Sequence, residues 1–174
     1  MTTTVKPVNP MKEISIAKLT LNVGAGKDED HLKKGLKLLQ KLTGVAPLKT
    51  ITQKRIPGWG LRPGLVVGCK ITLRTGAEEM LKRLLVAKEN ILSKKCFDTQ
   101  GNFSFGIPEY IDIQGMEYDP ELKILGLEAA VTLKRPGFRV SSRKLRPAKV
   151  GKKHAITQEE AIEFVKKKFG VEVK

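Results

Sequence analysis

Cysteine, histidine and long apolar runs are all scarce in this sequence. The two cysteines, Cys69 and Cys96, stand 27 positions apart with no second pair, which indicates neither a disulfide framework nor a paired-cysteine zinc site. No run approaches the roughly 18 apolar residues that a membrane span needs. Residues 1–13 contain no apolar core of the kind found in a secretory signal. We therefore expect free thiols, a cytoplasmic location and no membrane partner.

Acidic residues are absent from two long windows of the chain. Residues 31–77 contain ten Lys or Arg and no acid, and residues 129–158 contain nine and no acid. The other 97 residues contain 14 bases and 18 acids, so the whole net charge of +15 arises in these windows. Regions of one sign repel themselves, and a polyanion is the usual partner that neutralises them. Nucleic acid is the favoured partner, because neither window predicts the amphipathic helix that a membrane surface requires.

Apolar periodicity predicts strands and helices in a definite order. Alternating apolar and β-branched residues predict strands at 14–24, 47–53, 65–74 and 124–135. Apolar residues at helical spacing predict helices at 28–43, 77–93 and 156–170. We expect residues 97–121 to be irregular and the VEV tail to form a short edge strand. Residues 1–10 are expected to be a loose segment, and residues 11–174 a single domain.

The order β-α-β-β-α-β predicts an α+β fold. The economical arrangement is an antiparallel sheet with helices packed on one face, as in RNA-recognition and ferredoxin-like domains, with long basic loops added. Such a sheet leaves its other face free, and RNA-binding domains of this topology use that face.

Catalytic and cofactor motifs are not indicated. The run Gly24-Ala25-Gly26-Lys27 lacks the further glycine of a phosphate loop or a dinucleotide fingerprint, and the acids at 28–30 would repel phosphate. A tight strand-to-helix turn is the favoured interpretation. The two histidines, His31 and His154, have no partners in the sequence that suggest a catalytic group. We expect no enzyme activity, no cofactor and no metal.

The first basic loop, within residues 53–68, combines glycines, basic residues and the only tryptophan. Glycine lets the backbone approach a phosphate closely, and Trp59 can stack on a base or ribose, although it could instead fold back under the loop. The candidate binding residues of this loop are Lys54, Arg55, Gly58, Trp59, Gly60 and Arg62.

The second basic loop, residues 134–154, contains nine basic residues with a phenylalanine among them. It is a candidate RNA-binding loop, with a purely solvated loop as the alternative. Its candidate residues are Lys134, Arg135, Phe138, Arg139, Arg143, Lys144, Arg146, Lys149, Lys152 and Lys153.

Several segments together resemble one protein family. LTLNVGAG, QKRIPGWGLRPGLVVGCKITLR, FDTQGNFSFGIPE and TLKRPGF…KKHAITQEEAIEFV occur in the order found in the universal ribosomal protein family numbered five in the large subunit. The resemblance covers residues from about 9 to 173. The RPGF…KKH loop followed by a helix is similar to the archaeal and eukaryotic branch, and the short N-terminus to the archaeal one.

The resemblance implies a place in the central protuberance, with 5S rRNA, neighbouring large-subunit rRNA and other ribosomal proteins as partners. The positions that match the family's 5S rRNA contacts are Asn22, Thr50, Thr72 and Arg74. The loop around Trp59 is similar to the family's hairpin tip that contacts the peptidyl-site (P-site) tRNA. Val45 and Ala46 replace a polar and a basic residue of the family pattern, so a contact there is lost or shifted.

Two alternatives stay open at this point. A ribosome-assembly or general nucleic-acid-binding protein would bind any RNA or DNA alike. An RNA- or nucleotide-processing enzyme would require a metal or a catalytic side chain that the sequence does not reveal.

Overall fold

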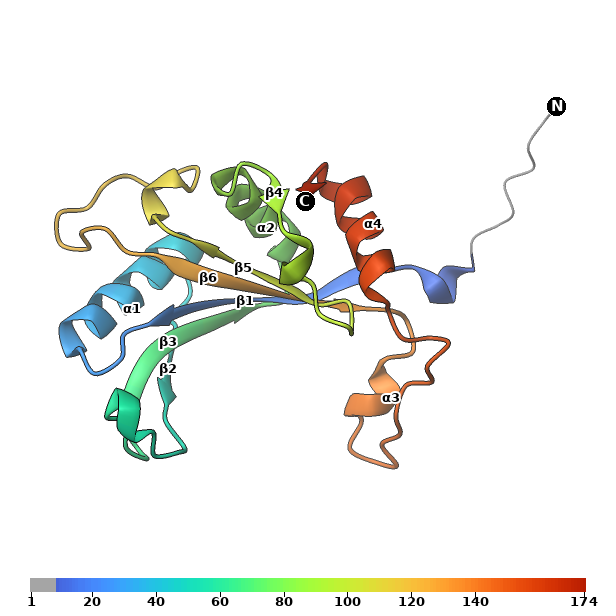
Figure 1. Cartoon of the computed structure of the whole chain (residues 1–174), viewed down its shortest axis with the longest axis horizontal. Helices are drawn as coiled ribbons and strands as arrows, with labels where there is room; N and C mark the ends of the chain where they lie inside the picture. The colour runs from blue at the N-terminus through green and yellow to red at the C-terminus, as the bar shows by residue number, and fades with distance from the viewer. Residues whose placement is uncertain (1–8) are drawn as a thin grey trace.

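A five-stranded antiparallel sheet forms the centre of the protein, whose computed structural model describes residues 9–174 (Figure 1). In spatial order the strands are β2 (Leu48–Ile51), β3 (Val66–Leu73), β1 (Ser15–Gly24), β6 (Leu127–Lys134) and β5 (Phe103–Ile107). Every neighbouring pair is antiparallel. A second, two-stranded parallel sheet pairs β4 (Ile91–Leu92) with β7 (Glu172–Val173).

Period-two alternation directs one set of side chains to the core. In β1, Leu19, Leu21 and Val23 are buried while the residues between them are partly exposed. The same pattern occurs in β5 and β6, where every second residue is buried. Side chains of a strand alternate between the two faces, so all of these apolar residues point to one side of the sheet.

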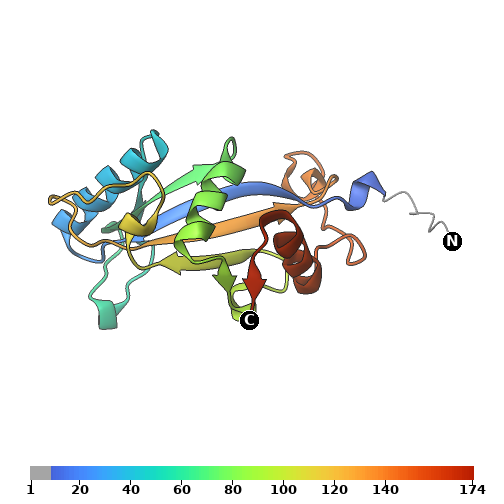
Figure 2. The ribbon, with the colours of Figure 1, turned by 90° about the horizontal axis from the view of Figure 1, so that it is seen from above.

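Three helices cover that side. They are α1 (Glu29–Thr43), α2 (Ala77–Ala87) and α4 (Gln158–Phe169), and Figure 2 shows the sheet behind them. Each buries apolar residues in the same core cluster, for example Leu38, Leu84 and Val165. Within residues 9–174, none of the helices has the length and apolar character that crossing a bilayer would take.

The α+β fold expected from the sequence is confirmed. The strands β6-β1-β3-β2 lie side by side in the order of the ferredoxin-like core, with helices on one face. The strand-to-helix turn at Gly24–Lys27 is also confirmed, since Asp28 caps α1 by accepting from the backbone N–H groups of Asp30 and His31. The tail forms β7, as expected, but pairs with β4 and not with the main sheet.

Two secondary-structure expectations are wrong. The stretch 97–121 is not wholly irregular, because it contains β5, whose five residues alternate between core and solvent. The helix predicted for 77–93 ends at Ala87, because Glu89 and Asn90 adopt left-handed backbone angles (φ 56° each) that cannot continue a helix. Ile91 and Leu92 are then free to form β4.

The beginning of the chain was expected to be loose over residues 1–10. Residues 1–8 lie outside the described residues. The described part starts with a turn of 3-10 helix at Pro10–Lys12, which is capped by the side chain of Asn9.

Arg135 fixes the start of the second basic loop to the core. Its side chain is only 5% exposed, and its Nη2 donates to Oε1 of Glu160 at 2.8 Å. Its other nitrogens donate to the backbone carbonyls of Lys12, His154 and Ala155 at 3.1–3.3 Å. The guanidinium is thus occupied within the protein, which is at odds with the expectation that Arg135 contacts RNA.

Glu160 also closes the capping box of α4 with Thr157, since each accepts from the backbone N–H of the other. The hydrogen bond from Arg135, followed by the one from the Thr157 backbone, lowers the pKa of Glu160 below its ordinary value of 4.5.

Glu160→Gln should destabilise the protein by about 1 kcal/mol. A hydrogen bond to a charged group contributes roughly 1.5–3 kcal/mol, and the partial exposure of Glu160 lets water replace part of it. Because the folded-state pKa is lowered, the wild type keeps this stability above the ordinary Glu pKa and loses it as pH falls through the lowered value. Thermal unfolding from about pH 7 down to about pH 3 should therefore show a smaller acid-dependent loss in the variant.

Glu159→Gln is the matched control, because Glu159 is exposed in the same helical turn. If both variants lose equal stability with the same pH profile, the Arg135–Glu160 contact does not hold the loop as described.

Candidate nucleic-acid interface

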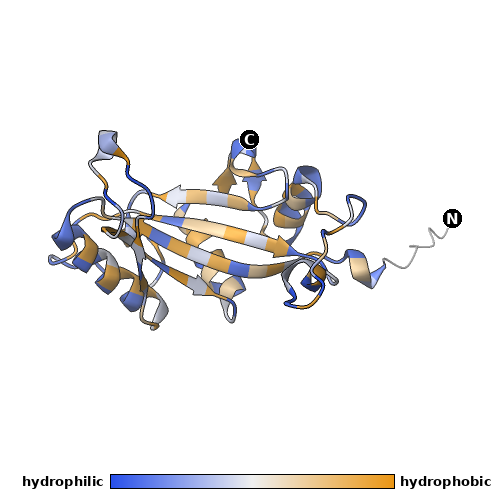
Figure 3. Cartoon of the chain, turned by 90° about the horizontal axis from the view of Figure 1, so that it is seen from below, coloured by the Kyte–Doolittle hydropathy of each residue, from blue (hydrophilic) through white to orange (hydrophobic). Residues whose placement is uncertain are grey.

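The face of the sheet opposite the helices is open. Figure 3 shows the strands uncovered from this side. Strand register places Asn22 opposite Lys70 and Thr20 opposite Thr72, and each of these side chains is exposed or partly exposed. These two pairs therefore present hydroxyl, amide and ammonium groups that can donate hydrogen bonds.

The residues predicted to bind 5S rRNA come together around this face. Asn22 and Thr72 lie on the adjacent strands β1 and β3. Thr50 of β2 pairs with Gly68, and Gly68 lies on the same face of β3 as Thr72. Arg74 directly follows β3 and is exposed or partly exposed, as the other three are. Four residues separated by up to 52 positions in the sequence thus share one surface, which is a geometric requirement for a common ligand.

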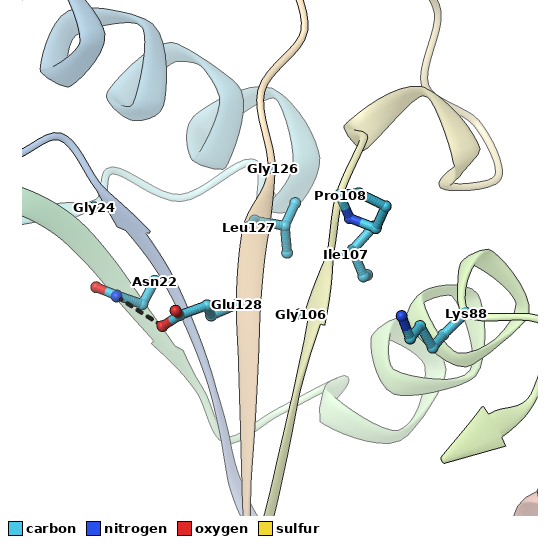
Figure 4. A pocket seen from close by; sticks show the side chains of 9 residues that line it. All are labelled: Asn22, Gly24, Lys88, Gly106, Ile107, Pro108, Gly126, Leu127 and Glu128. Carbon is cyan, nitrogen blue, oxygen red and sulfur yellow. Dashed lines mark hydrogen bonds between the residues drawn. The ribbon is translucent and has the colours of Figure 1, made fainter. Parts of the chain in front are cut away.

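A shallow cavity of about 540 Å³ opens at one end of this face (Figure 4). Asn22 Nδ2 donates to Oε2 of Glu128 at 3.3 Å across β1 and β6, and this bond orients the amide. Much of the remaining lining is glycine from three strand regions, namely Gly24, Gly106 and Gly126. An added Cβ would meet open space at Gly24 and Gly106, so a sugar or phosphate can approach the backbone closely there, whereas Gly126 packs against the carbonyls of Ile107 and Pro108.

The hairpin between β2 and β3 forms a first projecting arm, residues 53–64, which we call the hairpin arm. Ile56 and Leu61 exchange both backbone hydrogen bonds, at 3.1 and 3.0 Å, and close the tip. The tip itself is one 3-10 turn at Pro57–Trp59, ended by Gly60 at φ 60°. Trp59 is 72% exposed, so the alternative in which it folds back under the loop is wrong.

The basic residues of the hairpin arm surround this tip. Lys54, Arg55, Gly58 and Arg62 are all exposed. These four predicted binding residues are thus accessible together with the indole of Trp59, whereas Gly60 is only partly exposed.

Residues 135–155 form a second projection, which we call the basic arm. It contains the short helix α3 (Arg139–Ser142) and is held by local bonds, including Ala148 N–H to the Val140 carbonyl and Arg143 Nε–H to the Arg146 carbonyl. Phe138 is half-buried, in edge contact with the ring of His154 at 5.8 Å between centroids. Seven other predicted residues of this arm are exposed: Arg139, Arg143, Lys144, Arg146, Lys149, Lys152 and Lys153. Lys134, the last residue of β6, is also exposed.

Both arms project to the open side of the sheet, away from α1, α2 and α4 (Figure 1). They belong to the two acid-free windows, so the open face lies between two positively charged projections. Such an arrangement can neutralise the phosphates of a ligand on both sides while the sheet contacts its sugars and base edges.

Sequence reasoning missed two basic residues of this surface, Lys70 and Lys27. The two-residue repeat of a strand could have placed Lys70 on this surface, because Lys70 lies between Gly68 and Thr72 on the same face of β3. Nothing in the sequence around Lys27 indicated that its side chain reaches the hairpin arm. Its side chain crosses from the β1–α1 turn to the hairpin arm, where its ammonium occupies the position that a Cβ of Gly60 would take.

Groups suited to metal binding or nucleophilic chemistry are not assembled at this surface. Across residues 9–174, nowhere do three or more His, Cys, Asp or Glu converge as metal ligands would. Burial raises the pKa of the Cys69 thiol to about 11, which keeps it protonated and unreactive at neutral pH.

Comparisons with known proteins agree along the chain. A family model described as ribosomal protein L5 matches residues 9–62, and a model of the C-terminus of the same ribosomal family matches residues 66–167. The large ribosomal subunit protein uL5 of Nanoarchaeum equitans is 45% identical over 166 residues, which cover 95% of this chain and 98% of the relative. The uL5 of Methanococcus vannielii is 45% identical over 168 residues (94% and 93%), and that of Sulfurisphaera tokodaii is 44% identical over 168 residues (95% and 95%).

Gly60→Ala should destabilise the hairpin tip. Its left-handed backbone disfavours a Cβ by roughly 1–2 kcal/mol, and the new methyl group would overlap the Lys27 ammonium. We expect lower stability in denaturant unfolding and altered acrylamide quenching of Trp59, the only tryptophan.

Gly58→Ala is the matched control, because Gly58 has no positive φ and an added Cβ would have open space. Combining Lys27→Ala with Gly60→Ala should remove the overlap but keep the backbone strain. Equal effects of the alanines at 58 and 60 would contradict this description of the tip.

Proposed function

Because the chain belongs to the ribosomal protein L5 family, it is a structural protein of the large subunit of cytoplasmic ribosomes and not an enzyme, and we propose that it binds 5S rRNA. The resemblance seen in the sequence is thereby confirmed at the level of the family. In this proposal the protein lies in the central protuberance and also contacts adjacent large-subunit rRNA and neighbouring ribosomal proteins. One observation carries the proposal: an open sheet face lies between two arms that contain no acidic residue.

The sheet face supplies the recognition of RNA. The guanidinium of Arg74 can hold a phosphate with two parallel hydrogen bonds. The amide of Asn22 and the hydroxyls of Thr50 and Thr72 can bond ribose 2′-hydroxyls and base edges, which distinguishes RNA from DNA. The hydrogen bond from Asn22 to Glu128 pre-orients one of these groups before RNA arrives.

The hairpin arm supplies the contact with P-site tRNA. Its exposed Trp59 can stack on a base or ribose, which contributes about 1–3 kcal/mol per stacked base. Lys54, Arg55 and Arg62 can neutralise the phosphates beside it, and all are exposed. The basic arm binds large-subunit rRNA through its exposed lysines and arginines.

The decisive experiment is a binding titration at two salt concentrations. The protein is titrated with 5S rRNA, with an unrelated structured RNA of the same size and with duplex DNA. A preference for 5S rRNA that persists at the higher salt supports the proposal, because non-specific phosphate binding weakens with salt for all ligands alike. Equal binding of all three ligands would instead favour a general nucleic-acid-binding protein.

Arg74→Ala should weaken 5S rRNA binding by about 1 kcal/mol or more and reduce the slope of log affinity against log salt by about 1, because one phosphate contact is lost. The measurement is the same titration, repeated at several salt concentrations.

Lys82→Ala is the control for net charge, since Lys82 is exposed on α2 on the helical side. If Lys82→Ala and Arg74→Ala reduce affinity equally, the sheet face is not the 5S rRNA site.

Replacing residues 57–60 by Asn-Gly should leave 5S rRNA binding intact and impair translation. The paired Ile56 and Leu61 can be joined by a two-residue turn, so the hairpin closes without its tip. The readouts are 5S rRNA affinity and P-site tRNA occupancy of reconstituted ribosomes. Loss of 5S rRNA binding in this variant would show that the division of labour is wrong.

A further inference from the structure

A second cavity, of about 520 Å³, lies where the basic arm meets the end of the sheet. Three segments enclose it: the turn at residues 98–102, the end of β6, and the basic arm with the start of α4. Its lining residues are Thr99, Gln100, Asn102, Thr132, Leu133, Phe138, Ser141, Lys149, Val150, Ala155 and Ile156. It is separate from the cavity in Figure 4, which lies near Asn22.

The turn at residues 98–102 is a preformed wall of this cavity. The carboxylate of Asp98 accepts from the backbone N–H of Gln100 and from the side chains of Thr99 and Asn102. These bonds, the one from Gln100 first, lower the pKa of Asp98 and hold the turn in one conformation. Gly101 has a φ of 77° and packs so closely on Ile156 that an added Cβ would overlap it.

The opposite wall is held in place as well. The His154 ring, which meets Phe138 edge-on, is itself fixed by a 2.8 Å hydrogen bond between its Nε2 and the Pro136 carbonyl. Ser141 donates to the Phe138 carbonyl at 2.7 Å. Arg135, at the base of the arm, anchors this wall to α4 through Glu160.

The chemistry of the lining favours a nucleotide. It combines an aromatic ring, amide groups that can pair with a base edge, and the Lys149 ammonium for a phosphate, and it contains no acidic side chain. Its volume is within the roughly 300–1,000 Å³ of typical small-ligand sites. Sequence-specific RNA recognition uses unstacked bases that stack on aromatic side chains and form hydrogen bonds through their edges.

We propose that this cavity, which we call the corner pocket, binds a single unpaired nucleotide of RNA. The base contacts Phe138 and pairs with the amide of Gln100, while Lys149 neutralises the phosphate. The inference rests on the proposed RNA-binding function and adds to it a site that recognises an unpaired nucleotide.

The test is a titration of isotope-labelled protein, followed by NMR, with short oligoadenylate and oligouridylate, a blunt, fully paired RNA stem of two annealed strands, and AMP. The single strands should produce saturable shifts at Gln100, Asn102 and Thr132, and the paired stem should not. Equal shifts with the paired stem would overturn the proposal, because a duplex offers no unstacked base. Binding of AMP without binding of either oligonucleotide would also overturn it, in favour of a free-nucleotide site.

Two variants separate the pocket from general charge effects. Gln100→Ala should weaken oligonucleotide binding roughly fivefold or more with an unchanged salt slope, since it removes base contacts but no charge. Lys149→Ala should weaken binding and reduce the pocket shifts at a given oligonucleotide concentration. The control Lys144→Ala removes the same charge from an exposed position of the same arm and should keep the shifts. Equal behaviour of the two lysine variants would overturn the proposal.

Parallel titrations of wild type and Gln100→Ala with 5S rRNA separate the two levels of inference. If the wild type binds 5S rRNA but no single strand perturbs Gln100 or Asn102, only the corner pocket is wrong. If the wild type has no preference for 5S rRNA, the proposed function fails, whatever the pocket does.

Discussion

The alternation of buried and exposed side chains along the second half of β1 and along β5 and β6 is the constraint on which the rest of the structure depends. Only one face of such a sheet gains from burial, so all three long helices pack there and the other face stays open. The open face collects Asn22, Thr72 and Lys70 from different strands without a dedicated binding loop. Burial of Leu19, Leu21 and their neighbours thus positions groups that take no part in the core.

Electrostatic segregation gives the open side its chemical character. Acids on the helical side pair with lysines of α1 and α4, as in Lys37–Glu121, Lys41–Asp119 and Lys168–Glu78. The hydrogen bond that Lys37 donates to the Glu121 carboxylate raises the pKa of Lys37. Exposed pairs of this kind contribute only about 0–1 kcal/mol to stability each. These pairs affect the distribution of charge over the molecule, because they neutralise lysines on the helical side while the exposed basic residues of the arms stay uncompensated.

The two arms are anchored by different means, which suits different proposed partners. The buried guanidinium of Arg135 holds the base of the basic arm through four hydrogen bonds. One of these bonds goes to Glu160, which the capping box of α4 holds in place. The hairpin arm instead extends from β2 and β3, and its tip is closed by one backbone pair and packed against Lys27. A fixed arm is suited to a permanent rRNA contact, whereas a lightly held tip can adapt to tRNAs that come and go.

Local periodicity, composition and turn chemistry were enough to predict the antiparallel α+β core, the packing of helices on one face, the two acid-free windows and the place of Trp59 in a loop. They missed β5, since five residues among turn formers are a weak local signal, and they extended α2 past the left-handed Glu89 and Asn90. No local pattern predicts that Arg135 is buried against Glu160, that Lys27 reaches Gly60, or that residues 98–102 and 138–150 enclose one pocket. These contacts join segments that are far apart in the sequence, and their geometry depends on how the whole sheet brings the segments together.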